Sequence, residues 1–124
     1  MTRKPMENKT ILIVDDEPTL GDILSEALSV EGYATIFNRC CASARETLAN
    51  KDVNLVLLDA LLPTDGELSL LEYIKMIHPQ TPILMMTGCL ELTSSRAISQ
   101  GATDLLTKPF DLSDLYRHVK RALD

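Results

Sequence analysis

Residues 11–18 read ILIVDDEP, an apolar run followed at once by three acidic residues. Two similar apolar runs follow, LVLL at residues 55–58 and ILMM at residues 83–86. Apolar residues at consecutive positions, without alternation, are typical of strands that are covered on both faces in a parallel sheet. The three runs are therefore predicted to be the central strands of such a sheet.

Five short apolar runs occur at regular intervals. They extend over Thr10 to Val14, Tyr33 to Phe37, Asn54 to Leu58, Pro82 to Met86 and Thr103 to Leu106. Apolar residues at helical spacing lie between and after them, and the main sets are Leu20, Ile23, Leu24, Ala27 and Leu28; Leu70, Leu71, Ile74 and Ile77; and Leu112, Leu115, Val119 and Ala122. Weaker helices are expected around Ala44 with Leu48 and Ala97 with Ile98, and Gly32 is expected as a C-cap. This order predicts a doubly wound α/β sandwich, a flavodoxin-like (βα)5 fold whose parallel sheet has the strand order 2-1-3-4-5.

Length and composition restrict the class of protein. With 124 residues, 45% hydrophobic and 24% charged, the chain fits one soluble globular domain. The excess of 18 acidic over 12 basic residues argues against direct binding to nucleic acid or to a membrane, and favours cations and proteins as partners. The three cysteines lack metal-ligand spacing, which predicts that they are reduced. The chain has a short polar start and no run long enough to span a membrane, which predicts a cytoplasmic setting.

Polar side chains collect where the predicted strands end. Asp15 and Asp16 follow the first strand, Asp59 the third, Thr87 the fourth and Lys108 the fifth. In open α/β sheets, ligands bind beyond the carboxyl ends of the strands. Crowded carboxylates repel one another unless a cation neutralises them, and an all-oxygen site with few protein ligands suits Mg²⁺ or Mn²⁺. With an ammonium group and a hydroxyl beside the metal, the site is suited to phosphoryl oxygens.

Each of these residues also has a structural explanation that the sequence leaves open. Asp16 or Glu17 could cap the first helix, and Thr87 could lie at the N-cap of the fourth. Lys108 could be a solvated surface lysine. Asp59 is the residue that such explanations fit least, because it lies between two apolar stretches.

Four segments together resemble the signatures of one known family, and they read ILIVDDEP, LVLLDALLP, ILMMTG and GATDLLTKPF. They are similar, in order, to motifs of the response-regulator receiver domain, the phosphoacceptor module of two-component signalling. The resemblance extends over residues 9–124 and leaves residues 1–8 as a polar lead. It implies a domain that takes a phosphoryl group from a sensor histidine kinase or phosphotransfer protein and catalyses only its own phosphorylation and dephosphorylation.

The resemblance also implies a role for each site residue. Asp59 would be the phosphorylated aspartate, Asp16 a direct Mg²⁺ ligand and Asp15 a ligand through water. The backbone carbonyl of Leu61 would complete the protein's share of the coordination. Thr87 would bond a phosphoryl oxygen in the active state, and Lys108 would pair with the carboxylate and then with the phosphoryl group. Output would pass to a downstream protein or a second copy through a face built from the fourth helix, fifth strand and fifth helix, and this face would include Arg96, Leu105, Arg117, Lys120 and Arg121.

The sequence departs from the family pattern at several positions. The aromatic switch residue that the family usually has three positions before the lysine is replaced by Leu105. After Pro63 the family's glycine commonly falls one position later than Gly66, where this chain has Glu67. In the family, the side chains two positions beyond the phosphoacceptor and two beyond the threonine influence access of the hydrolytic water, and here these are Leu61 and Cys89. Neither can readily orient a water molecule, which predicts slower dephosphorylation than in receivers with polar groups at both positions.

Other functions remain as alternatives. The main one is a pseudo-receiver that binds proteins without being phosphorylated. A flavodoxin-like nucleotide binder would need backbone donors where Asp15 and Asp16 stand, and a haloacid-dehalogenase-type phosphatase would need a second aspartate at Glu17. A redox role for Cys40 and Cys41, and metal or catalytic roles for His78 and His118, have no supporting neighbours in the sequence.

Overall fold

The computed structural model describes residues 9–63, 69–88 and 92–124. Within these ranges the strands are β1 (Thr10–Val14), β2 (Ala34–Asn38), β3 (Leu55–Asp59), β4 (Ile83–Thr87) and β5 (Asp104–Thr107). They alternate with the helices α1 (Pro18–Val30), α2 (Cys41–Asn50), α3 (Leu70–Ile77), α4 (Ser94–Ser99) and α5 (Leu112–Leu123). All strand pairs are parallel and the order is β2-β1-β3-β4-β5, which confirms the predicted fold. The predicted polar lead, residues 1–8, lies outside the described residues.

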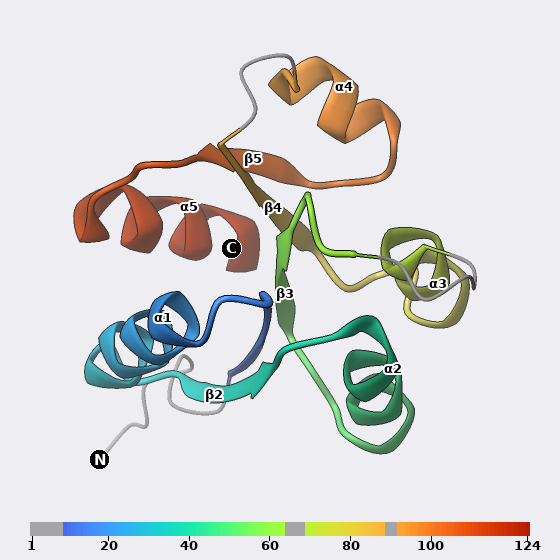
Figure 1. Ribbon diagram of the computed structural model, residues 1–124, viewed down its shortest axis with the longest axis horizontal. Coiled ribbons are helices and arrows are strands. Elements are labelled where there is room, and N and C mark those ends of the chain that lie inside the picture. Colours follow the sequence, from blue (N-terminus) through green and yellow to red (C-terminus); the bar gives the residue numbers. More distant parts are fainter. Residues whose placement is uncertain (1–8, 64–68, 89–91) are drawn as a thin grey trace.

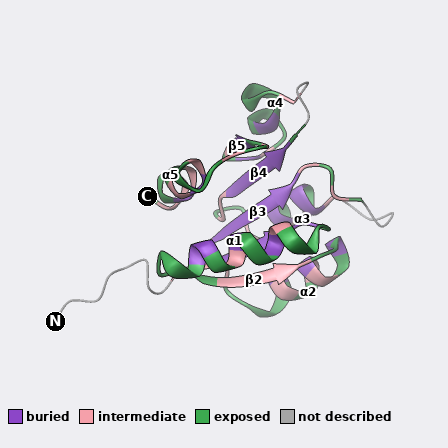
Figure 2. Cartoon of the chain, turned by 60° about the vertical axis from the view of Figure 1, so that its left-hand side comes forward, coloured by how far each residue is buried: buried purple, intermediate pink, exposed green. Residues whose placement is uncertain are grey.

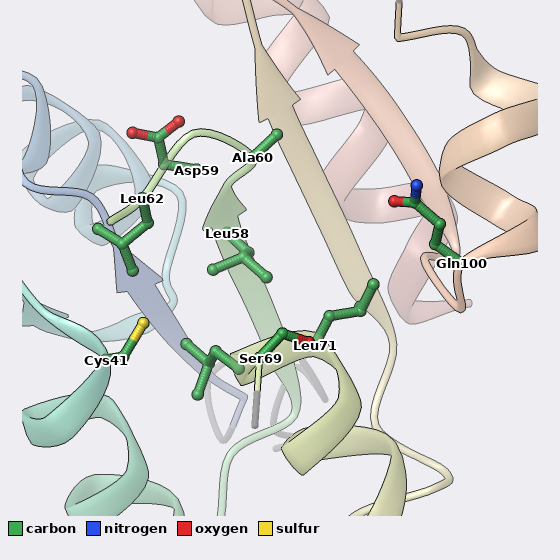
Figure 3. Close-up of a pocket in the computed structure, with 9 residues that line it drawn as sticks. Cys41, Leu58, Asp59, Ala60, Leu62, Ser69, Leu71 and Gln100 are labelled. Atoms are coloured by element: carbon green, nitrogen blue, oxygen red, sulfur yellow. The ribbon is translucent and has the colours of Figure 1, made fainter. Parts of the chain in front are cut away.

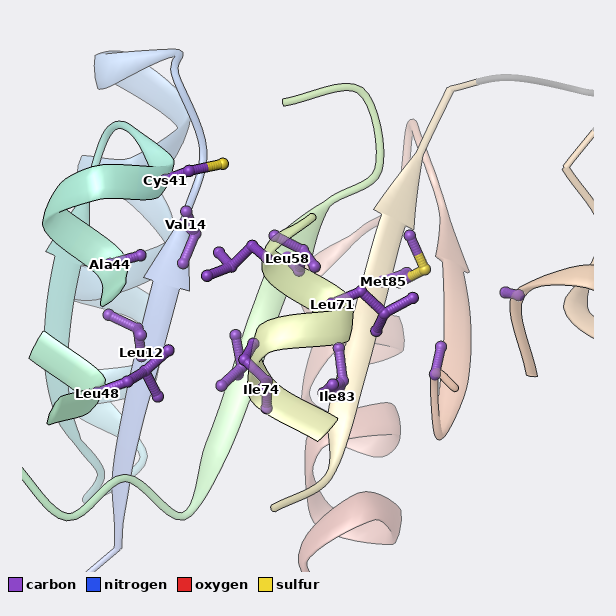
Figure 4. Packing of buried hydrophobic residues seen from close by; sticks show 14 of the residues in the cluster. Leu12, Val14, Cys41, Ala44, Leu48, Leu58, Leu71, Ile74, Ile83 and Met85 are labelled. Carbon is purple, nitrogen blue, oxygen red and sulfur yellow. The ribbon is translucent and has the colours of Figure 1, made fainter. Parts of the chain in front are cut away.

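Two layers of helices cover the sheet (Figure 1). Helices α1 and α5 lie on one face, and α2, α3 and α4 lie on the other. Alternate residues of each strand supply the two cores: Ile11 and Ile13 belong to the cluster on the α1 and α5 face, whereas Leu12 and Val14 belong to the cluster on the opposite face. Figure 4 shows this second cluster, in which Leu12 packs with Leu48 of α2 and β3 packs under α3.

The central strands are buried almost throughout, as predicted, whereas β2 at the sheet edge is half-buried (Figure 2). Four of the strands, β2 to β5, begin and end one residue later than the apolar runs that predicted them. Tyr33 shows the reason for β2. Its side chain is buried, but its N–H donates to the carbonyl of Leu28 at 3.1 Å and so closes the end of α1 instead of pairing with β1. At β2, burial therefore begins one residue before strand pairing does.

The helices form where the apolar periodicity predicts them, but some of the apolar residues in that pattern are exposed. Ile23, Ile77, Ile98 and Leu112 are exposed, because each lies at the margin of its helix's apolar face. Gly32 has a φ of 99°, which confirms the predicted left-handed cap. Gly21 allows close approach of α1 to β2, since a Cβ there would lie 1.9 Å from Cζ of Phe37. No described helix has both the length and the apolar character needed to cross a bilayer.

Candidate functional site

The predicted site residues meet at the carboxyl edge of the sheet because all the strands are parallel. Asp59 and Thr87 are the last residues of β3 and β4, Asp15 and Asp16 directly follow β1, and Lys108 directly follows β5. Asp15, Asp59 and Thr87 are the polar residues that the structure places among the buried ones in the described part of the chain. The three aspartates Asp15, Asp16 and Asp59 each offer a carboxylate oxygen within 4.8 Å of the other two.

Asp15 has both carboxylate oxygens engaged. Its Oδ1 accepts a hydrogen bond from the backbone N–H of Glu17 at 2.9 Å, and its Oδ2 accepts one from Nζ of Lys108 at 3.2 Å. The side chain of Asp15 is 1% exposed, so this ion pair is largely removed from water. Lys108 is thus not a free surface lysine, and it anchors a carboxylate 93 residues away in the sequence.

Asp59 is less well neutralised than Asp15. Its Oδ1 accepts a hydrogen bond from the backbone N–H of Leu61 at 3.0 Å and lies 3.9 Å from Nζ of Lys108. Burial is the largest influence on this carboxyl and raises its pKa above the ordinary value. The charges of Asp15 and Asp16 raise the pKa further, while the Leu61 N–H and Lys108 lower it in part. The folded protein therefore holds a buried carboxylate that lacks full charge compensation.

The donor set fits a hard divalent cation. Three carboxylates at mutual ligand distance supply only oxygen, which Mg²⁺ and Mn²⁺ prefer, and Asp16 is exposed so that water can complete the coordination. Asp16 does not cap α1: the N-cap is Glu17, whose side chain makes no capping hydrogen bond to a described residue. The metal-ligand role of the Leu61 carbonyl stays a prediction.

Thr87 and Leu105 connect the site to β5. Thr87 is 1% exposed, and its carbonyl accepts a hydrogen bond from the N–H of Lys108 at 2.6 Å. Thr87 does not cap the fourth helix, because α4 begins at Ser94 with Thr93 as its N-cap. Leu105 is buried in the same cluster as Ala97 of α4, so it lies beneath the surface of the face formed by α4, β5 and α5, and its part in output stays a prediction.

A cavity of about 160 Å³ lies beside Asp59 (Figure 3). Residues from the starts of α2 and α3, from the end of β3 and from the end of α4 line it, among them Cys41, Ala60, Leu62, Ser69 and Gln100. The carboxylate of Asp59 points away from Cys41 and Ser69, toward the carboxyl edge. Asp59 lines this cavity and also belongs to the acidic cluster, so the cavity adjoins the cluster.

Several residues weighed in the sequence lie away from the site. Cys40 is exposed whereas Cys41 is buried. The ring of His78 bonds the carbonyl of Leu48 at 2.8 Å, and the ring of His118 bonds that of Asp114 at 2.7 Å, so both rings make structural contacts. Arg117 pairs with Asp114 and Arg121 with Asp104 on the basic face of α5. The positions Gly66, Glu67 and Cys89 lie outside the described residues.

One residue near the site had no role assigned from the sequence. The carbonyl of Asn38, at the end of β2, accepts a hydrogen bond from the N–H of Asp15 at 3.2 Å. A main-chain contact of this kind leaves no pattern in residue types. The one available signal was the position of Asn38 at the end of the strand next to β1.

Comparison with known proteins agrees with this geometry. The family model of the response regulator receiver domain matches residues 11–120. The chain is 42% identical over 120 residues to the response regulator protein PilR of Pseudomonas aeruginosa, covering 95% of this chain and 27% of that protein. It is 35% identical over 119 residues to the DNA-binding transcriptional regulator NtrC of Rhizobium meliloti, covering 95% of this chain and 25% of that protein. The chain thus spans about a quarter of the length of these relatives.

Solved structures give the same result. The CheY-like response regulator receiver domain protein of Methanospirillum hungatei JF-1 superposes with a TM-score of 0.85 at 33% identity, covering 94% of both chains. The receiver domain of NtrX from Brucella abortus superposes with a TM-score of 0.82 at 36% identity, covering 91% of this chain and 97% of that one. This chain belongs to the response regulator receiver domain family.

Proposed function

We propose that Asp59 accepts a phosphoryl group from a phosphohistidine on a partner histidine kinase or phosphotransfer protein, with Mg²⁺ or Mn²⁺ at the acidic cluster. The observation that carries this proposal is the placement of three carboxylates and Lys108 at one edge of the sheet, with Asp59 buried and incompletely neutralised. A cation and an incoming phosphoryl group would make use of that arrangement. The domain would catalyse only its own phosphorylation and dephosphorylation.

In the reaction, a carboxylate oxygen of Asp59 attacks the phosphorus and an O–P bond forms. The P–N bond to the donor imidazole breaks, and its electron pair leaves with the imidazole nitrogen. The N–H of Leu61 holds Oδ1 of Asp59, which orients the carboxylate, and Lys108 offsets negative charge on the transferred oxygens. When bound, the divalent cation would supply further positive charge that offsets the negative charge of the reacting oxygens.

The residues of the site would take different parts in metal binding. Asp16 is exposed and would be a direct ligand, together with Asp59 and the carbonyl of Leu61. Asp15 would act through water, because the Glu17 N–H and Lys108 already engage both of its oxygens. Direct ligation by Asp15 would have to displace one of these partners.

Output is proposed to pass through α4, β5 and α5. Thr87 precedes α4 and Lys108 follows β5, so a phosphoryl group that attracts both side chains acts on this face. The exposed basic residues of the face are Arg96, Arg117, Lys120 and Arg121, which suit an acidic surface on a downstream protein or on a second copy. Leu105 is buried and would have to repack beneath α4, which favours a smaller change than a swinging aromatic ring would produce.

Intact-mass measurement after treatment with acetyl phosphate and Mg²⁺ tests the proposal. Wild type should gain the mass of one phosphoryl group, and Asp59→Asn should gain none. Asp52→Asn, at an exposed aspartate outside the cluster, is the matched control and should be modified like wild type. An adduct that persists in Asp59→Asn would overturn the assignment, and a wild type that takes up no phosphoryl group would favour the pseudo-receiver alternative.

A further inference from the structure

Asn38 extends the pairing of β1 with β2 to the acidic cluster. The last register pair of the two strands is Val14 with Asn38, and the hydrogen bond from the N–H of Asp15 to the carbonyl of Asn38 continues the pairing by one residue. Asp15 lies beyond the end of β1, so this bond holds main chain that the strand itself does not include. The end of β2 thereby sets where the backbone of Asp15 lies.

The side chain of Asn38 in turn fixes the end of β2 to α2. Its Oδ1 accepts a hydrogen bond from the hydroxyl of Thr47 at 2.7 Å, and its Nδ2 donates to the carbonyl of Phe37 at 3.3 Å. This connection matters because β2 is an edge strand (Figure 1) and is only half-buried. Core packing therefore holds the end of β2 less firmly than it holds the ends of β1 and β3. The contacts form a chain that runs from Thr47 through Asn38 to Asp15.

We propose that Asn38 and Thr47 are a positioning pair that holds the Asp15–Asp16 corner in the geometry that binds the divalent cation. The inference rests on the proposed function, since it concerns the same metal site. Mg²⁺ demands near-ideal octahedral geometry, so its affinity depends on how firmly its ligands are held. Residues that support metal ligands from outside the coordination sphere affect affinity in the same way.

Thr47→Val is the variant that tests the pair, because it removes the hydroxyl and keeps the branched shape of the side chain. Thr47→Ser retains the hydroxyl and serves as the rescue. Loss of a group that directly supports a metal ligand typically weakens binding 10–100-fold, and Thr47 acts one residue further away, so we expect Mg²⁺ to bind Thr47→Val about three- to fivefold more weakly. Thr47→Ser should bind like wild type.

Asn54→Ala provides a control for loss of stability alone. Its Oδ1 accepts a hydrogen bond of the same length, 2.7 Å, from the N–H of Thr10 at the opposite end of β1. Calorimetric titration with Mg²⁺ should show unchanged affinity in Asn54→Ala even where its melting temperature falls as far as that of Thr47→Val. Hydrogen exchange of the Asp15 amide, followed by NMR in the metal-free protein, should be faster in Thr47→Val and unchanged in Asn54→Ala.

The outcomes separate this inference from the proposed function. Unchanged Mg²⁺ affinity and unchanged Asp15 exchange in Thr47→Val would overturn the positioning pair, even if Asp59 is phosphorylated normally. Equal weakening of Mg²⁺ binding in Thr47→Val and Asn54→Ala would also overturn it, because the effect would then follow general stability. Conversely, a wild type that binds Mg²⁺ but takes no phosphoryl group would contradict the proposed function and leave the pair standing.

Discussion

The two ends of the sheet are built from different chemistry. At the amino ends of the strands, neutral side chains continue the backbone pairing: Asn54 accepts a hydrogen bond from the N–H of Thr10, and Thr103 Oγ1 accepts one from the N–H of Ile83 at 3.0 Å. At the carboxyl ends, the buried carboxylates of Asp15 and Asp59 lie near Lys108. Neutral hydrogen bonds stabilise the fold without electrostatic cost, whereas crowded like charges oppose it. The amino edge thus supports the structure, and the carboxyl edge concentrates charge for binding.

The pH dependence of stability should reveal this difference. Because burial raises the pKa of Asp59 above its ordinary value of 3.8, the folded state holds the proton more tightly than the unfolded state. Stability is therefore lost as pH rises from the ordinary value through the raised pKa, and then stays level. Urea unfolding of the metal-free protein across this range should show that loss in wild type and a smaller one in Asp59→Asn. Equal profiles would show that Asp59 carries no excess cost.

The largest effect is expected on removing the lysine of the carboxyl edge. Lys108→Met would leave Asp15 with a buried charge and no ammonium partner, and we expect the free energy of unfolding to fall by about 2 kcal/mol, less than for a fully buried pair because Lys108 is 26% exposed. Urea unfolding without metal measures it, and Lys51→Met at an exposed position is the control. A loss no greater than in the control would contradict the role of Lys108.

A smaller effect is expected at the amino edge. Asn54→Ala removes one hydrogen bond to backbone and should lower the free energy of unfolding by about 1 kcal/mol. The loss should be the same with and without Mg²⁺, because the carboxylate cluster found among the described residues lies at the opposite edge. A loss that depends on Mg²⁺ would show that the two edges are coupled.

The smallest effect on stability is expected at Asp16. This aspartate is exposed, so water screens its repulsion with Asp15 and Asp59, and Asp16→Asn should stabilise the metal-free protein by only a few tenths of a kcal/mol, roughly the scale of surface charge interactions. Its Mg²⁺ affinity should nevertheless fall by about tenfold or more if it is a direct ligand. Thermal unfolding and calorimetric titration of one preparation measure both, and unchanged affinity would exclude direct ligation.

The arrangement of the fold was predictable because it depends on local pattern. The runs ILIV, LVLL and ILMM identify buried central strands, and the parallel topology then places Asp15, Asp59 and Lys108 at one edge. These features follow from residue type and order. They do not require knowledge of side-chain direction.

What could not be predicted depends on geometry between distant residues. Lys108 approaches Asp15 more closely than Asp59, at 3.2 Å against 3.9 Å, and no spacing in the sequence distinguishes the two carboxylates. Ile23 fits the helical pattern of α1 and yet is 51% exposed, because the position of the apolar stripe relative to the sheet is set by packing. Asn38 contacts Asp15 through its backbone carbonyl, and residue identity does not reveal such a contact.

The most direct test of the account is the stability of wild type and Asp59→Asn, measured by urea unfolding at pH 7 with and without Mg²⁺. Without metal, Asp59→Asn should be the more stable protein by about 1 kcal/mol, because it removes a buried carboxylate. With Mg²⁺ at about a hundred times its dissociation constant, wild type should gain about 2.7 kcal/mol and become the more stable of the two. If Asp59→Asn is the less stable protein without metal, or gains as much from Mg²⁺ as wild type, the carboxyl edge is not the charged binding site described.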